Sequence, residues 1–355
     1  MSHSIPSKQK ALVLPEAYGQ YAVQEIDVIK PGAGEVLVRT EVVGLNPVDH
    51  SIQKRNLFSP KYPVIAGWEA AGTVVQLGDG VTSFAVGDKV FYPGTVWSNN
   101  TTAREYNVTP ADMCAKVPQN LTVDEAASIG LTLDTAALGL YSGPSGERSG
   151  AGLTPPWTEG GHGKYAGQPC VIFGGASGVG QYAIQLAKLS GYSPIITTAS
   201  VKNTEYLKSL GATHVLDRNF SPSSLTTTIA EITQKPVQLI FDAVSSADTQ
   251  NLGYELLSPG GTLVLVRLLL IPDDKITSEK RVTAVFGSPF LPDRRALSAE
   301  MYRQLTGMFE RGELKASILR LYGQAGPNMF PSVDQPRRSC PRWSRCYPGS
   351  LGEVW

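Results

Sequence analysis

The segment from Cys170 to Leu189 constrains the fold more than any other part of the chain. Four apolar or small residues, typical of a buried strand, are followed by the glycine-rich turn G-G-A-S-G-V-G and then by apolar residues at near-helical spacing. A strand, a glycine turn and a helix bring backbone N–H groups and the positive end of the helix dipole to one point, where a pyrophosphate binds. The turn consists of Gly174, Gly175, Ala176, Ser177, Gly178, Val179 and Gly180. Because Ser177 replaces the middle glycine of a strict G-x-G-x-x-G motif, a glycine-rich loop without a ligand stays open as the alternative.

The next hundred residues alternate between short apolar runs and helical patterns. Strands are predicted over residues 193–198, 213–216, 237–242 and 262–266, and helices over residues 203–210 and 249–257. Such alternation indicates right-handed βαβ units, so the sequence predicts an α/β fold with a doubly wound parallel sheet. The glycine turn then follows the first strand of a dinucleotide-binding domain.

Charge at the end of the second strand indicates which dinucleotide binds. An NAD site usually carries an acid about 20 residues after the glycines, to bind the ribose hydroxyls. No carboxylate lies between Thr197 and Thr204, whereas Ser200, Lys202 and the later Arg218 suit a 2′-phosphate. We therefore predict NADPH as the cofactor, with a solvated loop lysine as the alternative interpretation of Lys202.

Composition excludes several classes of partner. The chain has 355 residues with 31 basic and 31 acidic side chains, which disfavours a nucleic-acid-binding protein. Its longest apolar run, Leu263–Ile271, contains Arg267 and is too short to span a bilayer, and the N-terminus lacks an apolar signal core. These features predict a cytoplasmic protein without membrane contact. Four cysteines imply no disulfide framework.

The N-terminal part is richer in strand patterns and carries ordered motifs. Gly44–Asp49 (G-L-N-P-V-D), Tyr62–Val75 and Gly87–Val90 precede the glycine turn, and together they resemble the medium-chain dehydrogenase/reductase superfamily. The resemblance implies a GroES-like β-rich catalytic domain and a Rossmann nucleotide domain. We assign residues 1–135 to the former, with 290–326 returning to it, residues 136–289 to the latter, and 327–355 to an irregular tail.

Two departures from the zinc-dependent members of this superfamily bear on the chemistry. Those enzymes bind a catalytic metal through a cysteine and a histidine at the positions that Asn46 and Trp68 occupy here. Neither side chain offers a thiolate or an imidazole, and Cys114 stands alone where a structural zinc lobe has four cysteines. We therefore expect no metal, and we expect reduction of an activated double bond.

A narrower resemblance concerns fungal trans-acting enoyl reductases of the quinone-oxidoreductase-like branch. It rests on Asn46–Asp49, the glycine turn and the insert around Leu153–Trp157. It implies NADPH-dependent reduction of an α,β-unsaturated thioester on a carrier domain, with a polyketide synthase as partner in secondary metabolism. Two alternatives stay open: a quinone or enal reductase acting on free small molecules, and a non-catalytic NADPH-binding protein. The insert, residues 142–168, is also compatible with a flexible linker.

Three residues are candidates for the chemistry. Thr135 matches a family threonine expected near the nicotinamide carboxamide, or it caps a helix. Asn46 is expected to donate a hydrogen bond beside the nicotinamide, or it is a turn residue before Pro47. His50 has a suitable ordinary pKa for a proton donor, or it is an incidental loop histidine.

After Lys315 the pattern changes. A helix is expected over residues 296–310, but residues 327–348 carry repeated prolines and no strand or helix period. Members of the family end in a strand that returns to the first domain, and we do not expect this tail to pack as that strand. An altered reading frame would produce such a change of pattern.

Overall fold

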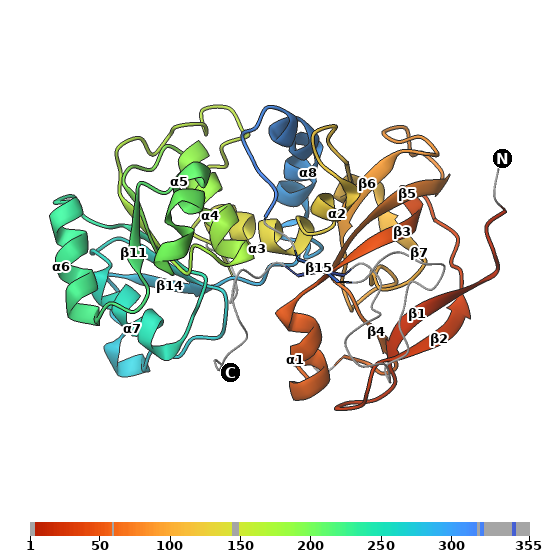
Figure 1. Ribbon diagram of the computed structural model, residues 1–355, viewed down its shortest axis with the longest axis horizontal. Helices are drawn as coiled ribbons and strands as arrows, with labels where there is room; N and C mark the ends of the chain where they lie inside the picture. The colour runs from red at the N-terminus through yellow and green to blue at the C-terminus, as the bar shows by residue number, and fades with distance from the viewer. Residues whose placement is uncertain (1–3, 59, 144–148, 318–319, 323–342, 346–355) are drawn as a thin grey trace. The chain divides into compact units, whose positions relative to one another are not determined.

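The computed structural model describes residues 4–58, 60–143, 149–317, 320–322 and 343–345 (Figure 1). The chain divides into two compact units. The first comprises Met1–Leu131, Ser298–Gly312 and Ala316–Trp355, and the second comprises Thr132–Leu297 and Glu313–Lys315. Among the described residues, every helix is too short or too polar to cross a membrane.

The second unit is built on a six-stranded sheet in the order β11-β10-β9-β12-β13-β14. All five strand pairs are parallel, so the predicted doubly wound parallel sheet is confirmed. The strands are β9 (Cys170–Phe173), β10 (Ile195–Ala199), β11 (His214–Asp217), β12 (Leu239–Asp242), β13 (Thr262–Leu265) and β14 (Arg281–Ala284). Helices α3 (Gly130–Tyr141, mostly in this unit), α4 (Gly178–Leu189), α5 (Thr204–Leu210), α6 (Pro222–Ile232) and α7 (Ala247–Leu256) accompany them, with the 3₁₀ turns η2 (Val201–Asn203) and η3 (Asp273–Lys275).

Two elements of this unit went unpredicted. Helix α6 begins with Ser221 as N-cap, whose hydroxyl accepts from the Ser224 N–H, and has Pro222 in its first turn. A serine cap followed by proline is a recognisable start signal. Strand β14 has the sequence R-V-T-A, which is too short and combines too many residue types to give a strand pattern. It is a strand because it pairs with β13.

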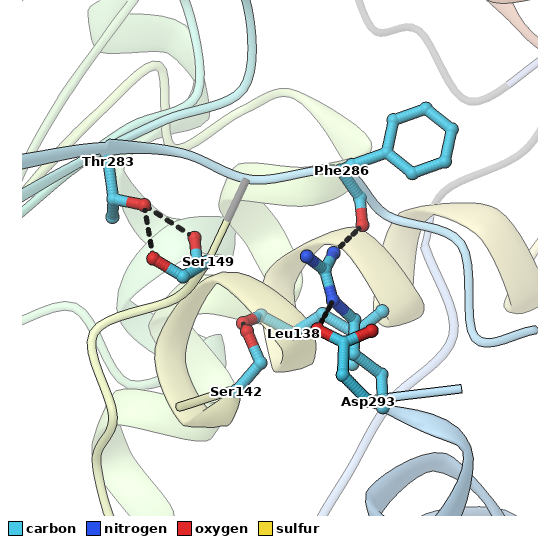
Figure 2. Close-up of polar contacts among 7 residues, drawn as sticks. Leu138, Ser142, Ser149, Thr283, Phe286 and Asp293 are labelled. Carbon is cyan, nitrogen blue, oxygen red and sulfur yellow. Dashed lines mark hydrogen bonds and ion pairs between the residues drawn. The ribbon is translucent and has the colours of Figure 1, made fainter. Parts of the chain in front are cut away.

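The insert between α3 and β9 is packed in its described part, residues 149–168, which contradicts a flexible linker there. Ser149 and Thr283 are joined by hydrogen bonds of 3.1 Å between their hydroxyls and 2.6 Å from the Thr283 hydroxyl to the Ser149 carbonyl (Figure 2). Tyr165 stacks on Tyr192 with ring centroids 5.2 Å apart. The described part of the insert is therefore packed against the rest of the second unit.

The first unit contains a three-stranded sheet, β2-β1-β4, and a larger sheet in the order β15-β16-β3-β5-β6-β8, with β7 on β3. The strands are β1 (Lys8–Leu14), β2 (Ala22–Asp27), β3 (Glu35–Leu45), β4 (Val64–Ile65), β5 (Glu69–Leu77), β6 (Lys89–Pro93), β7 (Tyr106–Pro110), β8 (Ala115–Lys116), β15 (Arg320–Tyr322) and β16 (Trp343–Arg345). Its helices are α1 (Pro47–Arg55), α2 (Val123–Ala126) and α8 (Arg295–Glu310, mostly in this unit), with the 3₁₀ turn η1 (Ala111–Met113). Valines and alanines on the inner faces of β3 and β5 form its core, and the predicted β-rich domain is confirmed.

Helix α1 corrects two expectations. Asn46 is its N-cap residue, so the Asn-Pro pair starts a helix and does not form a simple turn. His50 lies within this helix and is exposed, so it is not a loop histidine.

The tail also needs a correction. The strand Trp343–Arg345 pairs in parallel with Val43–Leu45 of β3, and Arg320–Tyr322 pairs with it on the other side. A segment within 327–348 therefore adds a strand to the sheet, which the surrounding prolines concealed. The other tail residues lie outside the described part of the chain.

Candidate active site

The glycine turn in the second unit has the geometry of an anion cradle. Ser177 is the N-cap of α4, and its hydroxyl accepts from the Gly180 N–H at 3.0 Å. The N–H groups of Gly178 and Val179 lie in the first turn, where no earlier helical carbonyl is available to them. A Cβ on Gly180 would lie 2.3 Å from the Gly174 carbonyl oxygen, so glycine is required for this close approach.

The glycine turn lies beside the end of β10. The residues that we predict to select the cofactor follow this strand. Ser200 is the N-cap of η2, which contains the exposed Lys202. The Arg218 N–H donates to the Ala199 carbonyl at 3.0 Å, which sets Arg218 beside this strand end. The structure thus brings Ser200, Lys202 and Arg218 to one edge of the sheet.

One carboxylate at this edge was missed by sequence reasoning. Asp217 is paired with Ala199 across β10 and β11. Its Oδ1 accepts from the Asn219 N–H at 3.0 Å, so this oxygen is turned to its own loop. Asp217 lies 18 positions after Ala199 in the sequence, so only the strand pairing reveals that this carboxylate is beside the end of β10.

Thr135 is the sixth residue of α3, so it neither opens nor caps the helix. It is half-buried and packs closely against Gly287, where an added Cβ would lie 2.2 Å from its Oγ1. Its role toward a nicotinamide stays a prediction.

The first unit holds a buried polar group centred on Glu69, the first residue of β5. The Asn46 side-chain amide donates from Nδ2 to Glu69 Oε1 at 2.7 Å, and the Leu131 N–H donates to Oε2 at 2.8 Å. The Asn46 N–H and the Gly67 N–H donate to the two oxygens of Asp49 at 2.9 and 3.1 Å. The carboxylates of Glu69 and Asp49 therefore fix the backbone that leads into α1 and into β5.

Burial dominates the electrostatics of both acids. Glu69 is 1% exposed, and loss of solvation raises its pKa to about 7 although the Asn46 and Leu131 donors oppose the change. Burial likewise raises the pKa of Asp49 to about 6, against its two backbone donors. Sequence reasoning missed both acids; an isolated glutamate in the apolar run Ala66–Val75 was the available signal.

An aromatic group lies next to this centre. Trp68 precedes Glu69 and is 4% exposed, and its ring centroid lies 6.1 Å from that of Phe58 and 5.7 Å from that of Trp97. Trp97 is half exposed and packs against Phe58 at 5.3 Å. Trp68 and Phe58 belong to the apolar cluster that also contains Leu14, Ile52 and Val64.

The donor set at this centre does not fit a zinc ion. Asn46 uses its amide nitrogen on Glu69, Trp68 has no metal-binding atom, and both Glu69 oxygens accept N–H groups. Within the described residues, no three His, Cys, Asp or Glu side chains cluster as metal ligands. Cys114 is buried, and burial raises the pKa of its thiol to about 12.

Comparison with known proteins identifies the family. The "Alcohol dehydrogenase GroES-like domain" family matches residues 32–119, and the "Zinc-binding dehydrogenase" family matches residues 178–290. The trans-enoyl reductase himH of Aspergillus japonicus is 33% identical over 259 residues, which are 71% of this chain and 71% of that protein. The trans-enoyl reductase grgB of a Penicillium species is 29% identical over 270 residues, 75% of this chain and 72% of that protein.

A solved structure supports the fold. The CurK enoyl reductase superposes with a TM-score of 0.68 at 21% identity, over 88% of this chain and 91% of that one. The family supports a nicotinamide cofactor, which agrees with the glycine turn of the second unit. The chain therefore belongs to the medium-chain dehydrogenase/reductase superfamily of oxidoreductases, and within it to the enoyl-reductase type.

Proposed function

We propose that the chain is a zinc-independent trans-acting enoyl reductase that uses NADPH to reduce the C=C bond of an α,β-unsaturated thioester. In this proposal the acyl group is attached to a carrier domain of a polyketide synthase. The observation that carries the proposal is the similarity to trans-enoyl reductases over more than two thirds of each chain, combined with a centre whose donor set does not fit a zinc ion.

The second unit supplies the residues that would hold the cofactor. The first-turn amides of α4 would bind the pyrophosphate, because they combine free N–H groups with the positive helix end. Lys202 and Arg218 would pair with a 2′-phosphate, and Ser200 would donate a hydrogen bond to it. This arrangement supports NADPH over NADH.

A conjugated double bond suits a centre without a Lewis acid. The bound nicotinamide would supply hydride to the electron-poor β-carbon. The thioester carbonyl already activates that carbon, so the protein needs to orient the substrate, exclude water and support a proton at the α-carbon. The apolar rings of Phe58, Trp68 and Trp97 would shield the acyl chain, while the buried Asn46–Glu69 pair provides polar contacts beside them.

The test uses purified full-length chain and NADPH oxidation followed at 340 nm. The substrates are crotonyl-N-acetylcysteamine, the same acyl group on a polyketide synthase carrier domain, a free enal and a benzoquinone. Higher kcat/KM on the carrier-bound enoyl group than on the others supports the proposal. Faster turnover of the free quinone or enal would assign a small-molecule reductase, and tight NADPH binding with no turnover of any substrate would assign a non-catalytic role.

A further inference from the structure

The exposed apolar side chains of the second unit share one position in its fold. Among the described residues of this unit, each exposed large apolar side chain follows the carboxyl end of a parallel strand. Val201 follows β10, Phe220 follows β11, Val244 follows β12, and Leu268–Leu270 follow β13. Because ligands of open α/β sheets bind outside this edge, an apolar rim here indicates a ligand with apolar parts.

Val201 and Phe220 come from one corner of this edge. Ala199, the last residue of β10, is paired with Asp217, the last residue of β11. The Arg218 N–H also donates to the Ala199 carbonyl at 3.0 Å. Neighbouring strands lie about 4.8 Å apart, so the two loops start side by side. Val201 comes two positions after the end of β10, and Phe220 comes three positions after the end of β11.

The turn that carries Phe220 is fixed by its own hydrogen bonds. The Phe220 N–H donates to the Asp217 carbonyl at 3.0 Å, and the Asn219 N–H donates to Asp217 Oδ1 at 3.0 Å. Ser221 is the N-cap of α6, so Phe220 is the residue before the cap. An apolar residue there often packs on the fourth helical residue, here Leu225. Leu225 is 5% exposed but Phe220 is 43% exposed, so much of the ring is open to a ligand.

The proposed cofactor brings a flat ring to this corner. In NADPH the adenine and the 2′-phosphate are attached to adjacent carbons of one ribose. Val201 lies between Ser200 and Lys202 in the sequence, and Phe220 lies two positions after Arg218. The polar residues proposed for the 2′-phosphate are thus next to the two apolar residues along the chain. A phosphate held by the former places the adenine beside the latter.

We propose that Phe220 is the residue on which the adenine ring of the cofactor stacks, with Val201 as a second apolar contact. The inference rests on the proposed function for the identity of the cofactor, and it assigns a base contact that the two phosphate contacts do not supply. Stacking uses the π face of the purine, which NADPH and NADH share. Phe220 therefore adds affinity for both cofactors, whereas Lys202 distinguishes them.

Phe220→Ala tests this contact by equilibrium titration of the full-length chain with NADPH and with NADH. Both dissociation constants should rise by a factor of about 5 to 150, the range found when an aromatic ring under a base is replaced by alanine. Phe220→Tyr keeps the ring and should bind within about twofold of the unaltered chain. Val86→Ala is the control, because Val86 is an exposed apolar residue of the first unit, and it should bind both cofactors unchanged.

Phe220→Leu separates stacking from a role in starting α6. Leucine keeps an apolar side chain before the cap but has no π face, so both dissociation constants should still rise at least about threefold. Its melting temperature should equal that of the unaltered chain. If Phe220→Ala does not fold, the comparison of the leucine and tyrosine variants carries the test, and equal binding by these two would refute the stacking contact.

A fragment of the cofactor locates the contact. Adenosine 2′,5′-bisphosphate contains the base and the 2′-phosphate but no nicotinamide. Its dissociation constant should rise in Phe220→Ala by the same factor as that of NADPH. The factor should also be the same at low and high salt, because salt screens the phosphate contacts and not the stacking. Lys202→Ala should instead weaken the bisphosphate and NADPH, with NADH unchanged.

Two results would overturn the proposal: unchanged dissociation constants in folded Phe220→Ala, or weakening of NADPH alone with NADH unchanged. The second result would mean that Phe220 acts through the phosphate contacts. Turnover of the enoyl substrate judges the proposed function separately. A chain that reduces this substrate but binds cofactor equally well in Phe220→Ala keeps the function and loses the inference. A chain whose cofactor binding depends on Phe220 but that reduces no substrate does the reverse.

Discussion

The backbone N–H of Gly174 donates to the Thr198 hydroxyl at 3.1 Å, and the next amide, that of Gly175, donates to the Thr198 carbonyl at 3.0 Å. These two contacts fasten the glycine turn to the end of β10. The same strand leads directly into Ser200 and Lys202. The proposed pyrophosphate and 2′-phosphate contacts are therefore positioned by one strand, and a change at either end should alter cofactor binding specifically.

Lys202→Ala should weaken NADPH binding by about 1–3 kcal/mol, because a charge-assisted contact to the 2′-phosphate is lost. NADH binding should hardly change. Fluorescence titration with both cofactors checks this. Lys208→Ala is the control, since Lys208 is an exposed lysine on the neighbouring α5 that pairs with Glu205. Equal affinity of the unaltered chain for NADPH and NADH would contradict the assignment.

Gly180→Ala should impair cofactor binding and lower stability by about 1–3 kcal/mol, because its Cβ would press on the Gly174 backbone. The turn must shift to relieve this contact. Gly307→Ala makes the same change inside α8, where the nearest atom belongs to the flexible Arg311 side chain. We expect that variant to be neutral or slightly stabilising. Urea unfolding and cofactor titration of both variants measure the difference.

Much of the second unit was predictable from local signals. The apolar run at Cys170–Phe173 correctly placed β9, because short buried strands leave strong marks in a sequence. The helix after the glycine turn was also predicted, but α4 begins at Gly178, inside the residues assigned to the turn. Alternation of strands and helices was enough to predict a parallel sheet. Strand β14 was not predictable, since it gains its structure from pairing with β13.

The first unit shows what sequence patterns leave out. Asn46 and Trp68 were recognised by their places in family motifs, but no pattern revealed that Glu69 contacts both the Asn46 side chain and the distant Leu131 backbone. That contact joins residues 62 positions apart and depends on the fold. Likewise, proline content hid the strand at Trp343–Arg345, whose pairing partner lies 300 residues earlier in the sequence.

Zinc should prove dispensable. Asn46 and Trp68 offer no thiolate or imidazole, and the Glu69 oxygens are engaged by N–H donors. Metal analysis of purified protein should give far less than one zinc per chain, and treatment with a chelator should leave turnover intact. Stoichiometric zinc that is needed for activity would overturn the proposed mechanism.

Stability should decrease as the pH rises from about 4.5 to about 7. The pKa of Glu69 increases from 4.5 to about 7 on burial, so the folded chain binds more protons than the unfolded chain in this window. Ionising the buried acid costs about 1.4 kcal/mol for each unit of difference. Glu69→Gln should flatten this part of the profile, whereas Glu205→Gln, at a side chain 91% exposed, should not. Urea unfolding between pH 4.5 and 8.5 measures the slope; identical slopes in Glu69→Gln and the unaltered chain would contradict the prediction.

Ser344→Pro should destabilise the first unit. Ser344 is the middle residue of β16, which pairs with β3 on one side and with β15 on the other. Each backbone N–H of such a strand points to one of its two neighbours, so a proline removes a donor from one of these pairs. The partner of Ser344 in β3 is Gly44, two residues before Asn46, and weaker pairing there should also loosen the start of α1. We expect the melting temperature to fall by about 2–4 °C for each kcal/mol lost. Ser344→Ala keeps the backbone donor and should melt like the unaltered chain; if the proline variant does so too, this strand contributes nothing to the stability of the sheet.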